Sequence, residues 1–159
     1  MQLFLLRHGE TVCEKVDPAR PLSVAGRDEV QRMAAFLKQA EFTVENFFHS
    51  NKDRACQSAD IVRQVVNPRA VLTEKSCLAP SDDIAEIVAE IAKLRENTLI
   101  AGHLPFLSSL VSYLVVADEM KSIVNFPTGG LVILELLSPG RWLIAGVYTP
   151  GVLRFMQGE

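Results

Sequence analysis

Short apolar runs alternate along this chain with segments in which apolar residues recur at helical spacing. A continuous apolar run is typical of a strand buried on both faces of a parallel sheet. The first such run ends at Arg7, immediately before His8, Gly9 and Glu10. The pattern predicts four strands, at residues 3–7, 44–49, 70–73 and 98–102.

Four helices are predicted between and after these strands, at about residues 23–39, 50–66, 82–94 and 105–114. Ser23 is suited to cap the first helix and Asp82 the third, because their side chains accept hydrogen bonds from free backbone N–H groups. Pro105 suits the first turn of the fourth. The positions expected to face the core are Val30, Met33, Ala34 and Leu37 in the first helix, Ala55, Ala59, Val62 and Val66 in the second, and Ile84, Ile87, Val88, Ile91 and Leu94 in the third.

The C-terminal part of the chain has a different pattern. Residues 131–137 and 142–148 flank Ser138-Pro139-Gly140, which predicts a hairpin. Strands that alternate with helices and end in a hairpin predict an α/β three-layer sandwich, a mostly parallel sheet flanked by helices with an antiparallel C-terminal edge. The chain shows no repeat or linker, so we expect one domain over residues 1–159.

Composition narrows the class of protein. The chain has 159 residues with a net charge of −3 and no Lys/Arg block, so nothing favours binding to nucleic acid or to an anionic membrane. Three cysteines are too few and odd in number for a disulfide framework. The N-terminus lacks a signal-peptide pattern, and the longest apolar stretch, residues 104–117, is too short to span a bilayer. We therefore expect a cytoplasmic protein.

Candidate chemistry lies just beyond the strands. In open α/β sheets the ligand binds beyond the C-terminal ends of the strands, which is where Arg7, His8 and His103 fall and where Arg54 follows shortly after a strand. A guanidinium matches phosphate in bidentate fashion, and a helix N-terminus near Arg54 adds N–H groups for an anion. Arg7, Arg54 and His103 are therefore the candidate phosphate-binding residues, which leaves His8 as a nucleophile that would become a phosphohistidine.

Three motifs occur in order: Arg7-His8-Gly9, then the run from Ser50 through Arg54-Ala55 to Gln57-Ser58, then Gly102-His103. Together they resemble the histidine phosphatase superfamily, also called phosphoglycerate-mutase-like, whose marks are R-H-G, S-x-x-x-R-A-x-Q-[ST] and a later G-H. The chain is most similar to the short bacterial phosphohistidine phosphatases, which it also matches at Asp17, Arg20-Pro21-Leu22-Ser23 and Gly26, and the resemblance runs from residue 1 to about residue 137.

The resemblance assigns the catalytic roles to the same four residues, His8, Arg7, Arg54 and His103, and implies no metal and no cofactor. It also suggests two residues with less defined parts. Arg20 matches the short subgroup and could reach into the pocket. Alternatively, it could form an ion pair that fixes the loop of residues 11–21. We expect this loop to lie over the site. Larger relatives use a carboxylate after the third strand as general acid. The candidates here are Asp82 and Asp83, of which Asp83 is the better positional match in the short subgroup, although both could merely cap the helix.

The sequence lacks the motifs, with their characteristic spacing, that other phosphate-handling and metal-dependent mechanisms require. Each cysteine lacks the arginine of C-x₅-R, no phosphate-binding G-x-x-x-x-G-K-[ST] loop or G-x-G-x-x-G occurs, and no C-x-x-C follows His8-x-Glu10. Three dispersed histidines, without carboxylates or thiolates at ligand spacing, argue against a metal. His49 has no motif role and is expected to be structural.

The leading hypothesis is a metal-independent phosphatase that forms a covalent phosphohistidine at His8 and most plausibly dephosphorylates a protein phosphohistidine, such as a histidine phosphotransfer domain. Imidazole leaves readily once its ring nitrogen is protonated, so the lack of an obvious acidic Glu favours a phosphoramidate. The alternatives are a phosphatase for a small metabolite, such as a sugar phosphate or nucleotide, and a non-catalytic phosphate-binding module.

Overall fold

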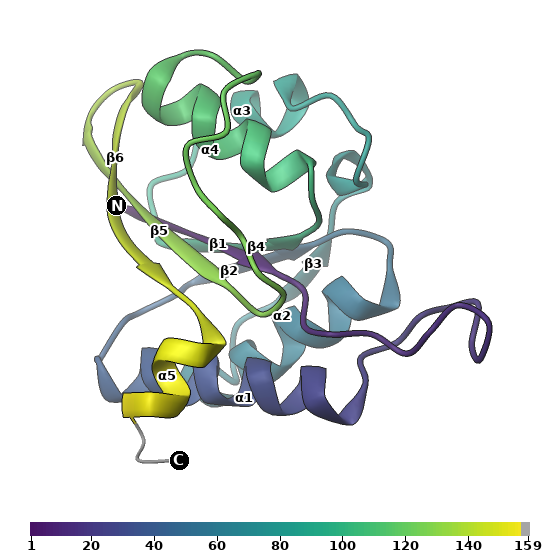
Figure 1. Ribbon diagram of the computed structural model, residues 1–159. Helices are drawn as coiled ribbons and strands as arrows, with labels where there is room; N and C mark the ends of the chain where they lie inside the picture. Colours follow the sequence, from purple (N-terminus) through teal and green to yellow (C-terminus); the bar gives the residue numbers. More distant parts are fainter. Residues whose placement is uncertain (157–159) are drawn as a thin grey trace.

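The computed structural model describes residues 1–156; the last three residues of the domain predicted for 1–159 lie outside this range. Strands and helices alternate, as the hydrophobic pattern predicts (Figure 1). The elements are β1 Gln2–Arg7, α1 Val24–Gln39, β2 Asn46–His49, α2 Asp53–Val66, β3 Leu72–Glu74, the 3₁₀ turn η1 Ser76–Leu78, α3 Ala85–Ile91, β4 Thr98–Gly102, α4 Phe106–Val116, β5 Leu131–Ser138, β6 Arg141–Tyr148 and α5 Pro150–Met156.

The six strands form one sheet in the order β3-β2-β4-β1-β5-β6. β1 lies inside it, parallel to β4 on one side and antiparallel to β5 on the other. β2 pairs parallel with both β3 and β4, and β6 pairs antiparallel with β5. The predicted fold class, a mostly parallel sheet with an antiparallel C-terminal edge, is therefore confirmed.

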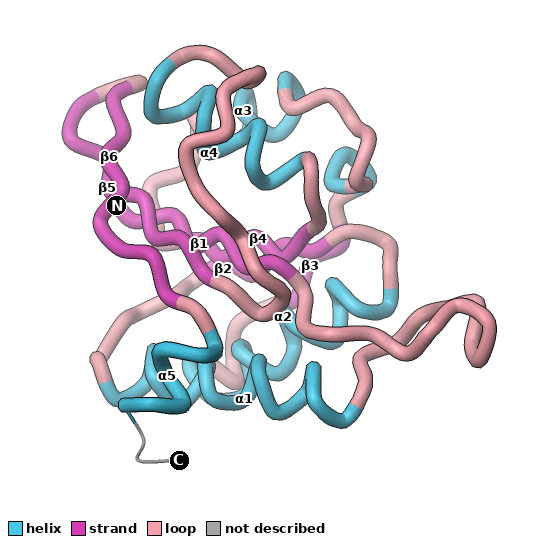
Figure 2. The backbone as a smooth tube through the Cα atoms, viewed as in Figure 1, coloured by secondary structure: helices cyan, strands magenta, loops and turns pink. Residues whose placement is uncertain are grey.

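Helices cover both faces of the sheet, so β1 is buried on both sides (Figures 1 and 2). Leu3 and Leu5 pack with α3 and α4, whereas Phe4 and Leu6 pack with α1 and α2. All four of these side chains are fully buried, which is why the first strand reads as a continuous apolar run rather than an alternating one.

The structure differs from the predicted elements at several places; β2 and β3, for instance, each begin two residues later than predicted. The helix α5 was not predicted; it follows β6 directly and packs against α1. The loop predicted over residues 75–81 contains η1, α2 begins at Asp53 rather than Ser50, and α3 ends before Leu94. The prediction that Asp82 caps α3 is wrong, because its Oδ2 accepts from the backbone N–H of Ala79 and closes the preceding turn.

Ser23 caps α1 as predicted, since its Oγ accepts from the backbone N–H of Gly26 at 3.0 Å.

Residues 11–21 form a long loop that projects from the body of the protein. A β-bridge between Thr11 and Leu22 joins the two ends of this loop (Figure 2). Within residues 1–156, no helix is both long enough and apolar enough to cross a membrane.

Candidate active site

The parallel strands β1, β2 and β4 end at the same edge of the sheet, where their following residues meet. Arg7 is in register with Gly102, and His49 with Ala101, so His8, Ser50 and His103 follow three neighbouring strand ends. The backbone N–H of His8 donates to the Gly102 carbonyl at 3.1 Å, and the rings of His8 and His103 lie 5.1 Å apart between centroids. The first and last motifs of the sequence therefore form one site.

His8 is held in the form that a nucleophile requires. Its Nδ1 lies 2.8 Å from the carbonyl oxygen of Gly9, which can only accept, so Nδ1 carries the proton and Nε2 keeps its lone pair. Burial lowers the pKa of His8 to about 4; the charges of Arg54, Arg7 and Arg20 act in the same direction, and the Gly9 hydrogen bond opposes them. The imidazole is therefore neutral near pH 7.

Gly9 lets the nucleophile approach the first helix closely. A Cβ on Gly9 would lie 2.4 Å from the carbonyl oxygen of Gly26 in α1, closer than a side chain allows. The N–H of Gly9 donates to Oγ of Ser58, and that hydroxyl donates to the Arg54 carbonyl at 2.7 Å. The last residue of the second motif thus ties the nucleophile segment to α2.

Three arginines surround His8, and each has a buried Nε without a partner. Arg7 donates from Nη1 to the Phe126 carbonyl at 2.6 Å, and Arg20 donates from Nη2 to Thr11 at 3.3 Å. Arg54 lies in the first turn of α2. Burial lowers the pKa of Arg7, and burial followed by the charge of Arg20 lowers that of Arg54. Three like charges without carboxylate partners are costly unless an anion joins them.

His103 is held by a hydroxyl from the neighbouring strand end. Its Nε2 lies 2.6 Å from Oγ of Ser50, and that oxygen also accepts from the backbone N–H of Lys52 at 3.4 Å. The hydroxyl oxygen of Ser50 has a second lone pair, so toward Nε2 it can either donate or accept. When Ser50 donates to Nε2, the proton of the neutral ring lies on Nδ1. Burial, then the charge of Arg54, lowers the pKa of His103 to about 3.

The unsatisfied donors converge on a single site. Among residues 1–156, the buried side-chain nitrogens without a hydrogen-bond partner are Nε of Arg7, Arg20 and Arg54 and Nδ1 of His103. Buried donors are almost always paired in folded proteins, and an unpaired one costs about 1–3 kcal/mol. The guanidinium nitrogens are donors, and so is Nδ1 of His103 in the tautomer that accepts from Ser50 at Nε2, so the partner that they fit is an anion rich in acceptor oxygens.

Comparison with known proteins agrees with this geometry. A model of the histidine phosphatase superfamily (branch 1) matches residues 3–78, the segment that holds His8 and Arg54. A solved structure of the protein histidine phosphatase SixA complexed with tungstate is 26% identical, covers 96% of this chain and 99% of its own, and superimposes with a TM-score of 0.87. The chain is therefore similar to the histidine phosphatase superfamily over residues 3–78, and to SixA over nearly its whole length.

Other solved phosphatase structures share the fold at lower identity. The alpha-ribazole phosphatase from Shigella flexneri is 16% identical with a TM-score of 0.77, covering 94% of this chain and 97% of its own. A phosphoserine phosphatase from Entamoeba histolytica is 12% identical with a TM-score of 0.72, over 94% of this chain and 97% of its own. No curated protein sequence matches the chain.

The structure brings together five of the six residues that the sequence singled out. Arg20 has φ +52° and an unpaired Nε, and no ion pair to an acidic side chain within residues 1–156 fixes it. Asp83 is the exception: it is exposed, its Oδ1 accepts from the N–H of Ala85 at 2.8 Å, and it lines a separate recess with Pro105 and Phe106. The role of Asp83 as a general acid stays a prediction.

Two contributions to this candidate site were not predicted as such. Ser50 was assigned only to the opening of a helix, but it contacts His103; its place at the head of the second motif was the available signal. The Phe126 carbonyl that holds Arg7 comes from the 118–130 loop, and nothing in the sequence marks a backbone acceptor there. His49, the last residue of β2, is buried, and its Nδ1 donates to the carbonyl of the next residue, Ser50, at 2.8 Å.

Proposed function

We propose that this chain is a metal-independent phosphatase that acts through a covalent phosphohistidine at His8, as a single domain in the cytoplasm. The observation that carries the proposal is the set of four unpaired donors around a neutral His8: Nε of Arg7, Arg20 and Arg54 and Nδ1 of His103. Phosphoryl transfer asks a protein mainly for positioning and for positive charge on the phosphoryl oxygens. These residues supply both.

The reaction follows from the tautomer of His8. The Nε2 lone pair attacks phosphorus, a P–N bond forms, and the bond from phosphorus to the leaving group breaks, with that electron pair going to the leaving atom. Water then attacks the phosphohistidine, the P–N bond breaks, its electron pair returns to Nε2, and orthophosphate is released. The guanidinium groups and His103 hold the phosphoryl oxygens through both steps.

The substrate that we favour is a protein phosphohistidine. The solved structure at 26% identity is a protein histidine phosphatase. An imidazole leaving group takes its proton on its own ring nitrogen, so this substrate does not depend on a buried acid. That fits the exposed position of Asp83.

A small metabolite is the second candidate because a polar cavity of about 380 Å³ adjoins the cradle. Arg20 and Arg54 line it together with Lys52, Asp53 and Glu14. Its size falls within the range of about 300–1,000 Å³ typical of small-molecule sites. A similar fold occurs in an alpha-ribazole phosphatase, and a sugar phosphate or nucleotide would occupy this cavity beside the cradle.

The decisive experiment compares kcat/KM on a phosphorylated histidine-containing domain with kcat/KM on a panel of sugar phosphates and nucleotides. A phosphohistidine protein favoured by at least tenfold supports the proposal, and a preferred metabolite supports the second candidate. A third candidate, a non-catalytic phosphate-binding module, predicts no turnover of either substrate, with tungstate still bound. Wild-type activity retained by His8→Ala would overturn the covalent mechanism.

A further inference from the structure

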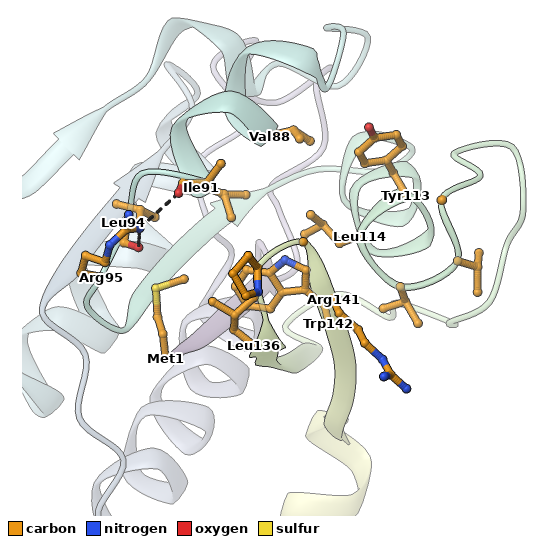
Figure 3. Close-up of a pocket in the computed structure, with 16 residues that line it drawn as sticks. Met1, Val88, Ile91, Leu94, Arg95, Tyr113, Leu114, Leu136, Arg141 and Trp142 are labelled. Atoms are coloured by element: carbon orange, nitrogen blue, oxygen red, sulfur yellow. Dashed lines mark hydrogen bonds between the residues drawn. The ribbon is translucent and has the colours of Figure 1, made fainter.

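A second cavity, of about 880 Å³, opens at the end of the sheet opposite to His8 (Figure 3). Its walls come from α3, α4 and the β5–β6 hairpin, and Met1, which precedes β1, contributes to it. The six residues of β1 separate the two ends of that strand by about 20 Å. The cavity is therefore separate from the phosphate cradle.

The walls of this cavity are mostly hydrocarbon. Figure 3 shows Ile91 from α3, Leu114 from α4 and Leu136 and Trp142 from the hairpin arranged around one space. Several of the lining side chains are only partly buried by the core that they pack against: Met1, Val88, Leu94, Leu114, Val115 and Leu136. Apolar surface left open in this way gains free energy when a hydrocarbon covers it.

The charged side chains that line the cavity are all positive, although the net charge of the whole chain is −3. None of the lining residues is acidic, whereas Arg95 and Arg141 are both among them. Arg95 donates from Nη1 to the carbonyls of Ala92 and Leu94, which leaves its Nε and Nη2 without a partner among residues 1–156. The side chain of Arg141 has no hydrogen bond or ion pair within the same residues. A ligand that fits has an apolar body and an anionic head.

We propose that this cavity binds a single-chain anionic amphiphile, with its hydrocarbon chain between α4 and the hairpin and its carboxylate at Arg95. The volume lies within the range of about 300–1,000 Å³ found for small-molecule sites. Arg141 is exposed, and in Figure 3 its side chain points away from the cavity and from Arg95, so Arg95 is the cation assigned to the head group.

The test uses Trp142, the only tryptophan of the chain, which lines the cavity. Dodecanoate is titrated into the full chain below its micelle concentration, and Trp142 fluorescence and calorimetry are recorded, with dodecanol as the uncharged probe. We expect a saturable fluorescence change, one dodecanoate per chain, and binding at least fivefold tighter than that of dodecanol. Hydrolysis of an aryl phosphate is measured in the same samples. Dodecanoate binding and phosphatase activity are then scored separately, so that the failure of one proposal can be told from the failure of the other.

Variants locate the binding to the cavity. Leu136→Asp should weaken dodecanoate binding at least tenfold, whereas Leu137→Asp, its neighbour on β5 but not among the lining residues, should not change it. Arg95→Gln alters an exposed side chain and should remove the preference for dodecanoate over dodecanol while leaving the melting temperature unchanged.

Four outcomes overturn the proposal. They are the absence of saturable binding, equal affinity for dodecanol in the unmodified chain, equal losses in Leu136→Asp and Leu137→Asp, and an Arg95→Gln variant that keeps the preference for the acid. Light scattering completes the test, because a dimer that forms without ligand and is broken by Leu136→Asp would show that a second copy of the chain covers this surface instead.

Discussion

The hydroxyl oxygen of Ser50 lies 2.6 Å from Nε2 of His103, and both residues are buried. This contact joins the second motif of the sequence to the third and holds the His103 ring. Under the proposed function, Ser50 is a positioning residue: it would act on the phosphoryl group through His103 rather than by touching it.

The first prediction concerns Ser50→Ala. It leaves Nε2 of His103 buried and unpaired, at a cost of about 1–3 kcal/mol, so we expect kcat/KM to fall about 5- to 150-fold. Nitrogen NMR should show that the proton of His103 is no longer confined to Nδ1. Ser112→Ala is the matched control, since Ser112 is equally buried and its hydroxyl donates to the Lys121 carbonyl. If the two variants lose equal activity and the His103 tautomer is unchanged, Ser50 has only a packing role.

The second prediction separates charge from geometry at Arg54. Arg54→Ala removes a contact to the transition state but leaves the nucleophile, so kcat/KM should fall by about 10²–10³-fold. Arg54→Lys should recover part of this loss, because a point charge cannot reproduce the bidentate fork. Arg63 on the same helix pairs with Asp60, and Arg63→Ala is the control expected to keep full activity. Full recovery by lysine would contradict the bidentate contact.

The third prediction distinguishes the two histidines by trapping the phosphoenzyme. His8→Ala should give no labelled protein, whereas His103→Ala should still form the label, slowly, because its nucleophile is intact. Labelled substrate is mixed with enzyme and quenched in alkali, since phosphohistidine is labile in acid. A label that persists in His8→Ala and disappears in His103→Ala would show that the roles are reversed.

The fourth prediction is a loss of stability in acid. The folded-state pKa values of about 4 for His8 and about 3 for His103 lie below the ordinary 6.5. Between about pH 4 and 6.5 the unfolded chain therefore binds more protons, so the free energy of unfolding rises with pH across this window. The melting temperature should fall from pH 7 to pH 4.5, and less steeply in His103→Gln. An equal pH dependence in both proteins would refute the assignment to His103.

The fifth prediction concerns metals and inhibitors. Among residues 1–156, no three His, Cys, Asp or Glu side chains are grouped so as to hold a metal ion. If the arginines supply the charge, EDTA should leave the rate unchanged, while vanadate and tungstate should compete with substrate. Loss of activity in EDTA that added Mg²⁺ or Zn²⁺ restores would disprove metal independence.

The sequence predicted the parts of this fold that repeat a simple period. The buried strand at residues 3–6 and the helix from Val30 to Leu37 were both found where expected. A strand buried on two faces gives a continuous apolar run, and a helix buried along one stripe gives apolar residues at helical spacing. The helix α5 was missed because it is short, at seven residues, with Pro150-Gly151 at its start. Its packing on α1 is a tertiary contact that no local pattern records.

The site was predictable to the extent that its residues sit at strand ends. His8 and His103 follow β1 and β4, whose pairing brings them together. Arg20 could not be decided from the sequence, because its φ of +52° and the return of its loop depend on contacts across the fold. The position of Asp83 depends similarly on how the turn before α3 closes, which Asp82 determines through Ala79.

The place of β1 inside the sheet bears on when a ribosome-bound chain could become active. Arg7 lies in β1 and precedes β5 by more than 120 residues, yet its backbone N–H donates to the Gly130 carbonyl, its guanidinium donates to the Phe126 carbonyl, and β1 pairs with β5. A nascent chain that has not yet emerged through β5 lacks all three constraints. Catalytic competence should therefore arise only late in synthesis, so that translation products cut short before β5 carry every motif residue and still remain inert.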